Sequence, residues 1–102
     1  MSRIPVFEKF VADRPDDPFP RYALAMEYKS AGRAEDAIAS LRELARRAPG
    51  YVPTYLQLAQ FLATLGKSAE ARAAYEAGIA AARTAGNAHA LSELTEGLAS
   101  LG

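Results

Sequence analysis

The fold of this chain is constrained most by a pattern of residue types that recurs after 34 residues. The first copy lies between Leu24 and Pro49, and its recurring sites are Leu24, Ala25, Tyr28, Gly32, Ala37 and Leu41. The same or similar residue types return as Leu58, Ala59, Leu62, Gly66, Ala71 and Tyr75. A fixed period of this length is typical of repeat proteins, in which successive units stack and share a continuous core.

Apolar residues throughout the chain follow the spacing of α-helices. Phe7, Phe10 and Val11, for example, occupy one helical face. No segment alternates apolar and polar residues as a half-buried strand would. Because the connections are short, neighbouring helices should run antiparallel. The predicted helices cover residues 4–14, 18–31, 34–48, 53–66, 69–84 and 88–101.

Several residues mark where these helices begin and end. Asp17 stands directly before a proline, which is a helix-start signal. Ser68 and Asn87 are the predicted N-caps of the last two helices. Gly32 and Gly66 suit the left-handed turn that often ends a helix.

The composition is that of an ordinary globular protein, and we expect a single domain over residues 1–102. Lys and Arg number 12, as do Asp and Glu, so no strong field is available to hold nucleic acid or an anionic membrane. The chain has no cysteine and no apolar run of membrane-spanning length. Residues 1–10 lack the features of a secretory signal, so we expect a cytoplasmic protein.

At the recurring sites the chain resembles the tetratricopeptide repeat (TPR) family, whose unit is a helix–turn–helix of 34 residues. The sites that match in residues 18–51 are Leu24, Ala25, Tyr28, Gly32, Ala37, Leu41 and Pro49. Those that match in residues 52–85 are Tyr55, Leu58, Ala59, Leu62, Gly66, Ala71, Tyr75 and Gly78. The segment 4–14 resembles the second half of an earlier repeat, and 88–102 the first half of a later one. The resemblance implies an all-α, right-handed superhelical solenoid of about six antiparallel helices.

Three sites depart from the family pattern. Arg21 stands where Tyr55 stands in the second repeat, Leu44 fills a site that is usually small, and Arg83 replaces the closing proline. None of these residues breaks a helix, so we expect longer or reoriented helices rather than a different fold.

Residues that could carry catalysis are few. The one histidine, His89, is interpreted as a solvated surface residue, and no carboxylates with metal-ligand spacing surround it. Asp16 and Asp17 are better explained as helix-capping residues than as a cation site. The arginines Arg42, Arg46 and Arg47 are interpreted as a solvated helix end rather than a nucleic-acid contact. We therefore predict a non-catalytic protein without cofactor or metal.

The resemblance implies a concave groove, lined by the first helices of the repeats, that binds a peptide or a helix of another protein. The residues that this groove would contain are Phe19, Tyr22, Met26, Lys29, Pro53, Leu56, Gln57, Gln60, His89, Ser92 and Glu96. Phe19, Tyr22 and Met26 have no strict echo 34 residues later, which is expected of binding residues and not of scaffold. The alternative for Tyr22 and Met26 is that they pack against the N-terminal helix.

One subclass of the family, which holds the C-terminal carboxylates of chaperones, uses lysine and asparagine in this groove. The matching sites here carry Tyr22, Met26 and Gln57. We therefore predict that the chain has no such carboxylate clamp.

A second hypothesis is self-association through the N-terminal edge. The first predicted helix has too many apolar residues for one face, and a solenoid needs a polar cap at each end. The candidate residues are Ile4, Val6, Phe7, Phe10 and Val11. On this hypothesis the partner is a second copy of the chain.

Overall fold

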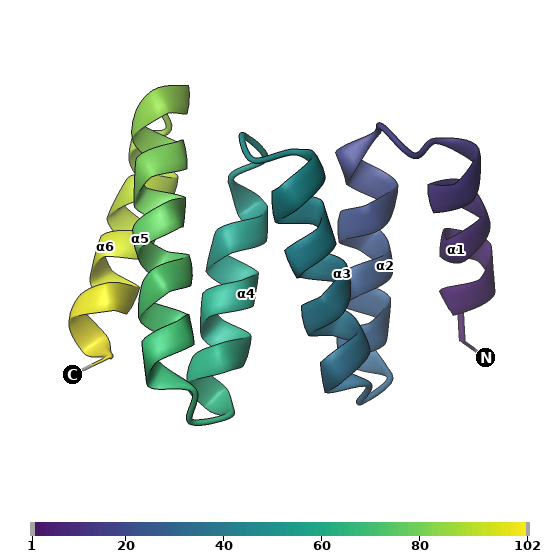
Figure 1. Ribbon diagram of the computed structural model, residues 1–102, viewed down its shortest axis with the longest axis horizontal. Helices are drawn as coiled ribbons and strands as arrows, with labels where there is room; N and C mark the ends of the chain where they lie inside the picture. Colours follow the sequence, from purple (N-terminus) through teal and green to yellow (C-terminus); the bar gives the residue numbers. More distant parts are fainter. Residues whose placement is uncertain (1, 102) are drawn as a thin grey trace. The chain divides into compact units, whose positions relative to one another are not determined.

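The recurring apolar pattern folds into α-helices in the computed structural model, which describes residues 2–101 (Figure 1). Met1 and Gly102, which belong to the predicted domain, lie outside the described residues. Residues 2–101 contain no strand, so the prediction of an all-α chain is confirmed. The helices are α1 (Ile4–Asp13), α2 (Pro18–Ser30), α3 (Ala34–Arg47), α4 (Pro53–Thr64), α5 (Ser68–Ala85) and α6 (Ala88–Ser100).

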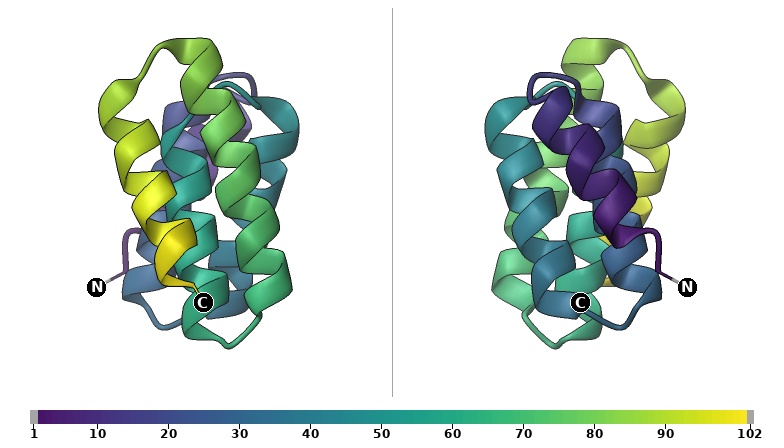
Figure 2. Two further views of the ribbon diagram at one scale, coloured as in Figure 1. Left: turned by 90° about the vertical axis from the view of Figure 1, so that its left-hand side faces the viewer. Right: turned by 90° about the vertical axis from the view of Figure 1, so that its right-hand side faces the viewer.

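The helices form two units, Met1–Ala48 with α1 to α3 and Pro49–Gly102 with α4 to α6. In the first unit α2 packs against both α1 and α3. In the second unit α5 packs against α4 and α6, and α4 also contacts α6. Figure 2 shows α6 beside α5 in its left view and α1 along α2 in its right view. The single domain over 1–102 stays a prediction.

The recurring apolar sites are buried in both units, which explains why they recur. Leu24, Ala25, Tyr28, Ala37 and Leu41 are buried in the first unit, and their counterparts Leu58, Ala59, Leu62, Ala71 and Tyr75 in the second. Each large side chain that is removed from water in this way contributes about 1.5–3 kcal/mol to folding. These residues are scaffold.

The two turn glycines adopt the left-handed conformation that the sequence predicts. The φ angle is 74° at Gly32 and 77° at Gly66. After each glycine the chain closes the helix end in the same way: the N–H of Arg33 donates to the Tyr28 carbonyl, and that of Lys67 to the Leu62 carbonyl, both at 2.9 Å. These bonds satisfy carbonyls that a helix end leaves without partners.

Two of the predicted N-caps are confirmed and one is wrong. The carboxylate of Asp17 accepts from the N–H of Phe19, and the side-chain oxygen of Asn87 accepts from that of Ala90, each at 3.0 Å. Ser68, however, is the first residue inside α5, and Lys67 occupies the cap position without a side-chain hydrogen bond. The helix begins early because the N–H of Ala71 already bonds the Lys67 carbonyl.

Candidate functional site

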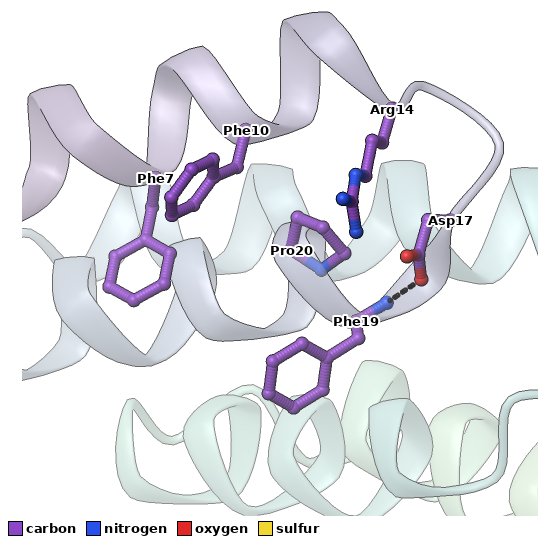
Figure 3. Close-up of a pocket in the computed structure, with 6 residues that line it drawn as sticks. All are labelled: Phe7, Phe10, Arg14, Asp17, Phe19 and Pro20. Carbon is purple, nitrogen blue, oxygen red and sulfur yellow. Dashed lines mark hydrogen bonds between the residues drawn. The ribbon is translucent and has the colours of Figure 1, made fainter.

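Aromatic residues from α1 and the first turn of α2 surround a pocket of about 250 Å³ in the first unit. Its lining residues are Phe7, Phe10, Arg14, Asp17, Phe19 and Pro20. In Figure 3 the rings of Phe7 and Phe10 project from α1, and the guanidinium of Arg14 points toward Pro20 and Asp17. The pocket is therefore apolar along most of its wall, with one cation and one carboxylate at one end.

The two aromatic rings on α1 support one another. The rings of Phe7 and Phe10 meet edge to face, with centroids 5.9 Å apart and an interplanar angle of 73°, a preferred aromatic geometry. The guanidinium of Arg3 lies 5.8 Å from the centroid of the Phe7 ring, within the range of a cation–π contact. Phe7 is half-buried by these contacts, whereas Phe10 is 46% exposed.

The start of α2 holds Phe19 in a rigid but exposed position. Asp17 caps the helix by accepting the Phe19 N–H, as the dashed line in Figure 3 shows. Pro18 and Pro20 suit this first turn, where a backbone N–H has no intrahelical partner. Pro20 is buried, yet Phe19 beside it is 65% exposed. The cap thus holds the backbone of Phe19, while its large apolar ring stays at the surface, where the fold gains little from it.

Polar contacts anchor α1, one wall of the pocket, to α2, the other wall. The hydroxyl of Tyr28 donates to the carboxylate of Glu8 at 3.1 Å, and Arg3 pairs with Glu27 at 2.8 Å. The guanidinium of Arg33 stacks 4.7 Å from the centroid of the Tyr28 ring. Burial and then the bond to Glu8 raise the pKa of the Tyr28 hydroxyl, so it donates in its neutral form.

The predicted groove residues on α2 differ in exposure. Phe19 and Lys29 are exposed, while Tyr22 and Met26 are half-buried. The half-burial of Tyr22 and Met26 leaves both of their interpretations open, because each side chain has one part in contact with the protein and another in water. Only Phe19 of this set lines the pocket.

The remaining groove residues lie on α4 and α6, which are in contact within the second unit. Pro53, Gln60, His89, Ser92 and Glu96 are exposed, and Leu56 and Gln57 are half-buried. His89 lies on the surface as predicted, with its Nε2 3.2 Å from a carboxylate oxygen of Glu93. Neither of the two pockets described here, one in each unit, is lined by any of these residues of α4 and α6.

The predicted self-association residues divide into three groups. Val6 and Phe10 are 52% and 46% exposed, and Phe7 and Val11 are half-buried. Ile4 is only 5% exposed. Ile4 must therefore be removed from the set, because a side chain already inside the core has no surface to offer a second copy.

The predicted groove and the predicted self-association edge, which the sequence suggests as separate surfaces, contribute residues to the same pocket. Phe19 comes from the predicted groove, and Phe7 and Phe10 come from the predicted self-association edge, yet all three line one pocket. Arg14 and Pro20 are lining residues that the sequence analysis missed. The accumulation of prolines around an aromatic residue in 15–20 is the signal that could have marked this turn as unusual.

A second pocket, of about 630 Å³, lies in the second unit, and half of its lining residues are alanines of α5. Its one aromatic residue, Tyr55, already donates its hydroxyl to the Pro49 carbonyl at 2.6 Å. Because alanine offers neither charge nor a large contact area, this pocket has little with which to recognise a ligand.

Two further findings concern other classes of site. Within residues 2–101, no group of three or more His, Cys, Asp or Glu residues could hold a metal ion. None of the helices in the described part of the chain is both long and apolar enough to cross a membrane.

Comparisons with known proteins agree with this architecture. The tetratricopeptide repeat family model matches residues 28–94, more than half of the chain. The crystal structure of a tetratricopeptide repeat domain protein from Salinibacter ruber is 38% identical, with a TM-score of 0.79, over 83% of this chain and 94% of that one. The comparison with curated proteins yielded no match.

Two other solved structures are similar. A protein from Bordetella parapertussis is 28% identical, with a TM-score of 0.81, over 99% of this chain and 88% of that one. The Sgt2 TPR domain from Aspergillus fumigatus is 21% identical, with a TM-score of 0.79, over 96% of this chain and 62% of that one, and this likeness concerns the fold alone. On the family match and the identity to the Salinibacter domain, this chain belongs to the tetratricopeptide repeat family.

Proposed function

We propose that this chain binds a peptide or a helix of another protein, and that its α1–α2 pocket receives an apolar side chain of that partner. The tetratricopeptide repeat fold supports a role in protein–protein interaction in general. The observation that carries the finer proposal is the convergence of Phe7, Phe10 and Phe19 on one pocket of about 250 Å³. A pocket of this volume suits one large side chain.

The free energy of burying Phe19 also favours the binding of a partner at this pocket. Phe19 is 65% exposed, so a partner that covers it gains free energy that folding has not already used. Full burial of such a side chain contributes about 1.5–3 kcal/mol. Interfaces concentrate their binding energy in a few aromatic residues of this kind, particularly where a pocket lies beside them. Because Asp17 caps the turn that carries Phe19, the backbone of this turn is already ordered before a partner binds.

The predicted groove residues of α2 supply more of the proposed contact surface in the first unit. Tyr22, Met26 and Lys29 continue from Phe19 along α2, and the residues of α4 and α6 offer a more polar surface in the second unit. Tyr22, Met26 and Gln57 at the clamp sites support a partner other than a chaperone C-terminus. Proteins of this family are generally non-catalytic, and we propose no enzymatic role. The cytoplasmic location stays a prediction.

Peptide selection against the intact chain tests the proposal. Peptides selected from a random display library should carry a large apolar residue, and their affinity can be measured by calorimetry. Phe19→Ala should weaken binding by roughly tenfold, the loss expected of one aromatic anchor. Leu65→Ala is the matched control, because Leu65 is an apolar residue of the second unit that is 46% exposed. Equal affinities for the Phe19 variant and the parent chain would refute the pocket as the binding site.

A second candidate function is self-association through α1. The observation that favours it is the exposure of Val6 and Phe10 on one helix, at 52% and 46%. Since Phe10 also lines the pocket, a second copy and a peptide would compete for the same ring.

A further inference from the structure

Arginines crowd one carboxylate where the end of α3 lies against the start of α2. The carboxylate of Glu43 accepts from Arg46 at 3.0 and 2.5 Å and from Arg47 at 2.6 Å. Both oxygens of Glu43 are therefore occupied by α3's own arginines. Hydrogen bonds from Arg46 and then Arg47 lower the pKa of Glu43 to about 2, so it remains charged under ordinary conditions.

Arg21, in the first turn of α2, is the third cation of this cluster. Its side chain is half-buried and makes no hydrogen bond or ion pair with any residue in the described range 2–101. Burial and then the charge of Arg47 lower the pKa of Arg21, and the attraction of Glu43 offsets only part of this effect. The positive end of the α2 dipole also disfavours a cation there. Three guanidiniums against one carboxylate leave two excess positive charges.

The second repeat holds a different kind of residue at the site of this arginine. The equivalent residue in the second unit is Tyr55, which is buried and donates its hydroxyl to a backbone carbonyl. In the first unit the same scaffold site holds a half-buried cation, and the carboxylate that attracts it, Glu43, is already hydrogen-bonded to Arg46 and Arg47. A cation in such a place lowers stability unless an anion joins it.

We propose that Arg21, Arg46 and Arg47 form a site for a carboxylate side chain of an acidic segment of a partner protein. Guanidinium groups bind carboxylates through paired, charge-assisted hydrogen bonds. Arg46 retains donors for this purpose, since its side chain is 68% exposed. Two excess charges suit one or two carboxylates better than a phosphate backbone, which needs a longer basic stripe.

This site shares no residue with the lining of the α1–α2 pocket, so the two proposals can be tested independently. The probe is a hexaglutamate peptide at low ionic strength, followed in ¹H–¹⁵N spectra of the intact chain through the arginine side-chain Nε–H signals. Saturable shifts should be confined to Arg21, Arg46 and Arg47. Arg21→Gln should weaken binding by roughly fivefold, the scale of one partly exposed ion pair, while the melting temperature stays level or rises. Arg83→Gln, in the second unit, is the matched control and should leave binding unchanged.

A second variant should change the affinity for hexaglutamate in the opposite direction. Glu43→Gln removes the carboxylate that competes for Arg46 and Arg47, so it should tighten hexaglutamate binding. Three outcomes would overturn the proposal: shifts spread evenly over all cationic residues, equal affinities for Arg21→Gln and the parent chain, or tighter binding of a hexathymidylate oligonucleotide than of hexaglutamate. The last outcome would assign the site to nucleic acid.

Discussion

Two helices approach Gly78 so closely that no side chain fits between them. A Cβ atom built at Gly78 would lie 2.6 Å from the Cβ of Tyr55 on α4 and 2.9 Å from a methyl carbon of Leu94 on α6. Such distances lie well inside van der Waals contact, and the Cβ of Tyr55 moves only if its helix moves. The small residue that the repeat pattern predicts at this site is thus required by the packing of three helices.

Gly78→Ala should therefore destabilise the chain by about 1–2 kcal/mol, because overpacking outweighs the better helix propensity of alanine. Urea denaturation measures the change. Gly50→Ala is the control: its added Cβ meets nothing within 4 Å, and the residue lies outside the left-handed region. We expect the control to be neutral or slightly stabilising. A Gly78→Ala chain as stable as the parent would show that α4 and α6 can separate at no cost.

The pH dependence of Glu43 is a second consequence at the scale of one residue. Its pKa in the folded chain is about 2, below the ordinary value of 4.5, because Arg46 and Arg47 hold the charged form. A lowered pKa adds stability above the unfolded value and loses it as the pH falls. The stability difference between the parent chain and Glu43→Gln should thus be fully present above pH 4.5 and shrink toward pH 2. Carboxyl NMR shifts give the midpoint, and a value near 4.5 would contradict the ion pairs.

At the scale of an element, α1 depends on a few identifiable contacts. Its N-cap residue, Arg3, makes no side-chain capping bond, and α1 is the shortest of the six helices described in 2–101. Ile4 enters the core, and Glu8 and Arg3 reach Tyr28 and Glu27 on α2. A short helix of this kind is marginal without such tertiary contacts.

Tyr28→Phe should loosen α1 selectively. The change removes the hydrogen bond to Glu8 but keeps the ring in the core, so we expect a cost of about 0.5–1.5 kcal/mol. Amide hydrogen exchange in α1 should accelerate by up to roughly tenfold, because local opening becomes easier there. Amides of α5 serve as the internal reference. Uniform acceleration in both helices would mean that Tyr28 supports global stability rather than the docking of α1.

The helices could largely be predicted from the sequence, whereas their contacts could not. Period, caps and glycine turns are local signals, and they locate all six helices to within about two residues. Ser68 failed as a cap because the bond from the N–H of Ala71 to the Lys67 carbonyl already places Ser68 inside α5. Local signals thus predict elements well and predict their first residue less well.

At the scale of the whole molecule, the missing information is tertiary. The burial of Ile4 and the meeting of Phe19 with Phe7 and Phe10 depend on how α1 lies against α2, which no spacing in the sequence encodes. The hydroxyl of Thr54 is a similar case. It is buried with no hydrogen-bond partner among the described residues, and the presence of a threonine in the sequence does not predict this burial. The sequence analysis therefore named the three aromatic residues that line this pocket but assigned them to two surfaces.

We expect the association state of the chain to depend on that shared surface. With Val6 and Phe10 exposed on α1, we expect weak self-association, visible in light scattering after size exclusion as a mass that rises with concentration toward that of two chains. Phe10→Glu should return the mass to that of one chain, because a charge cannot be buried in an apolar contact without a partner. Leu65→Glu is the control, since Leu65 has the same 46% exposure but lies at the end of α4. A selected peptide that fills the pocket should dissociate the dimer, as both need Phe10. A constant single-chain mass across micromolar concentrations would eliminate self-association and leave peptide binding as the use of this surface.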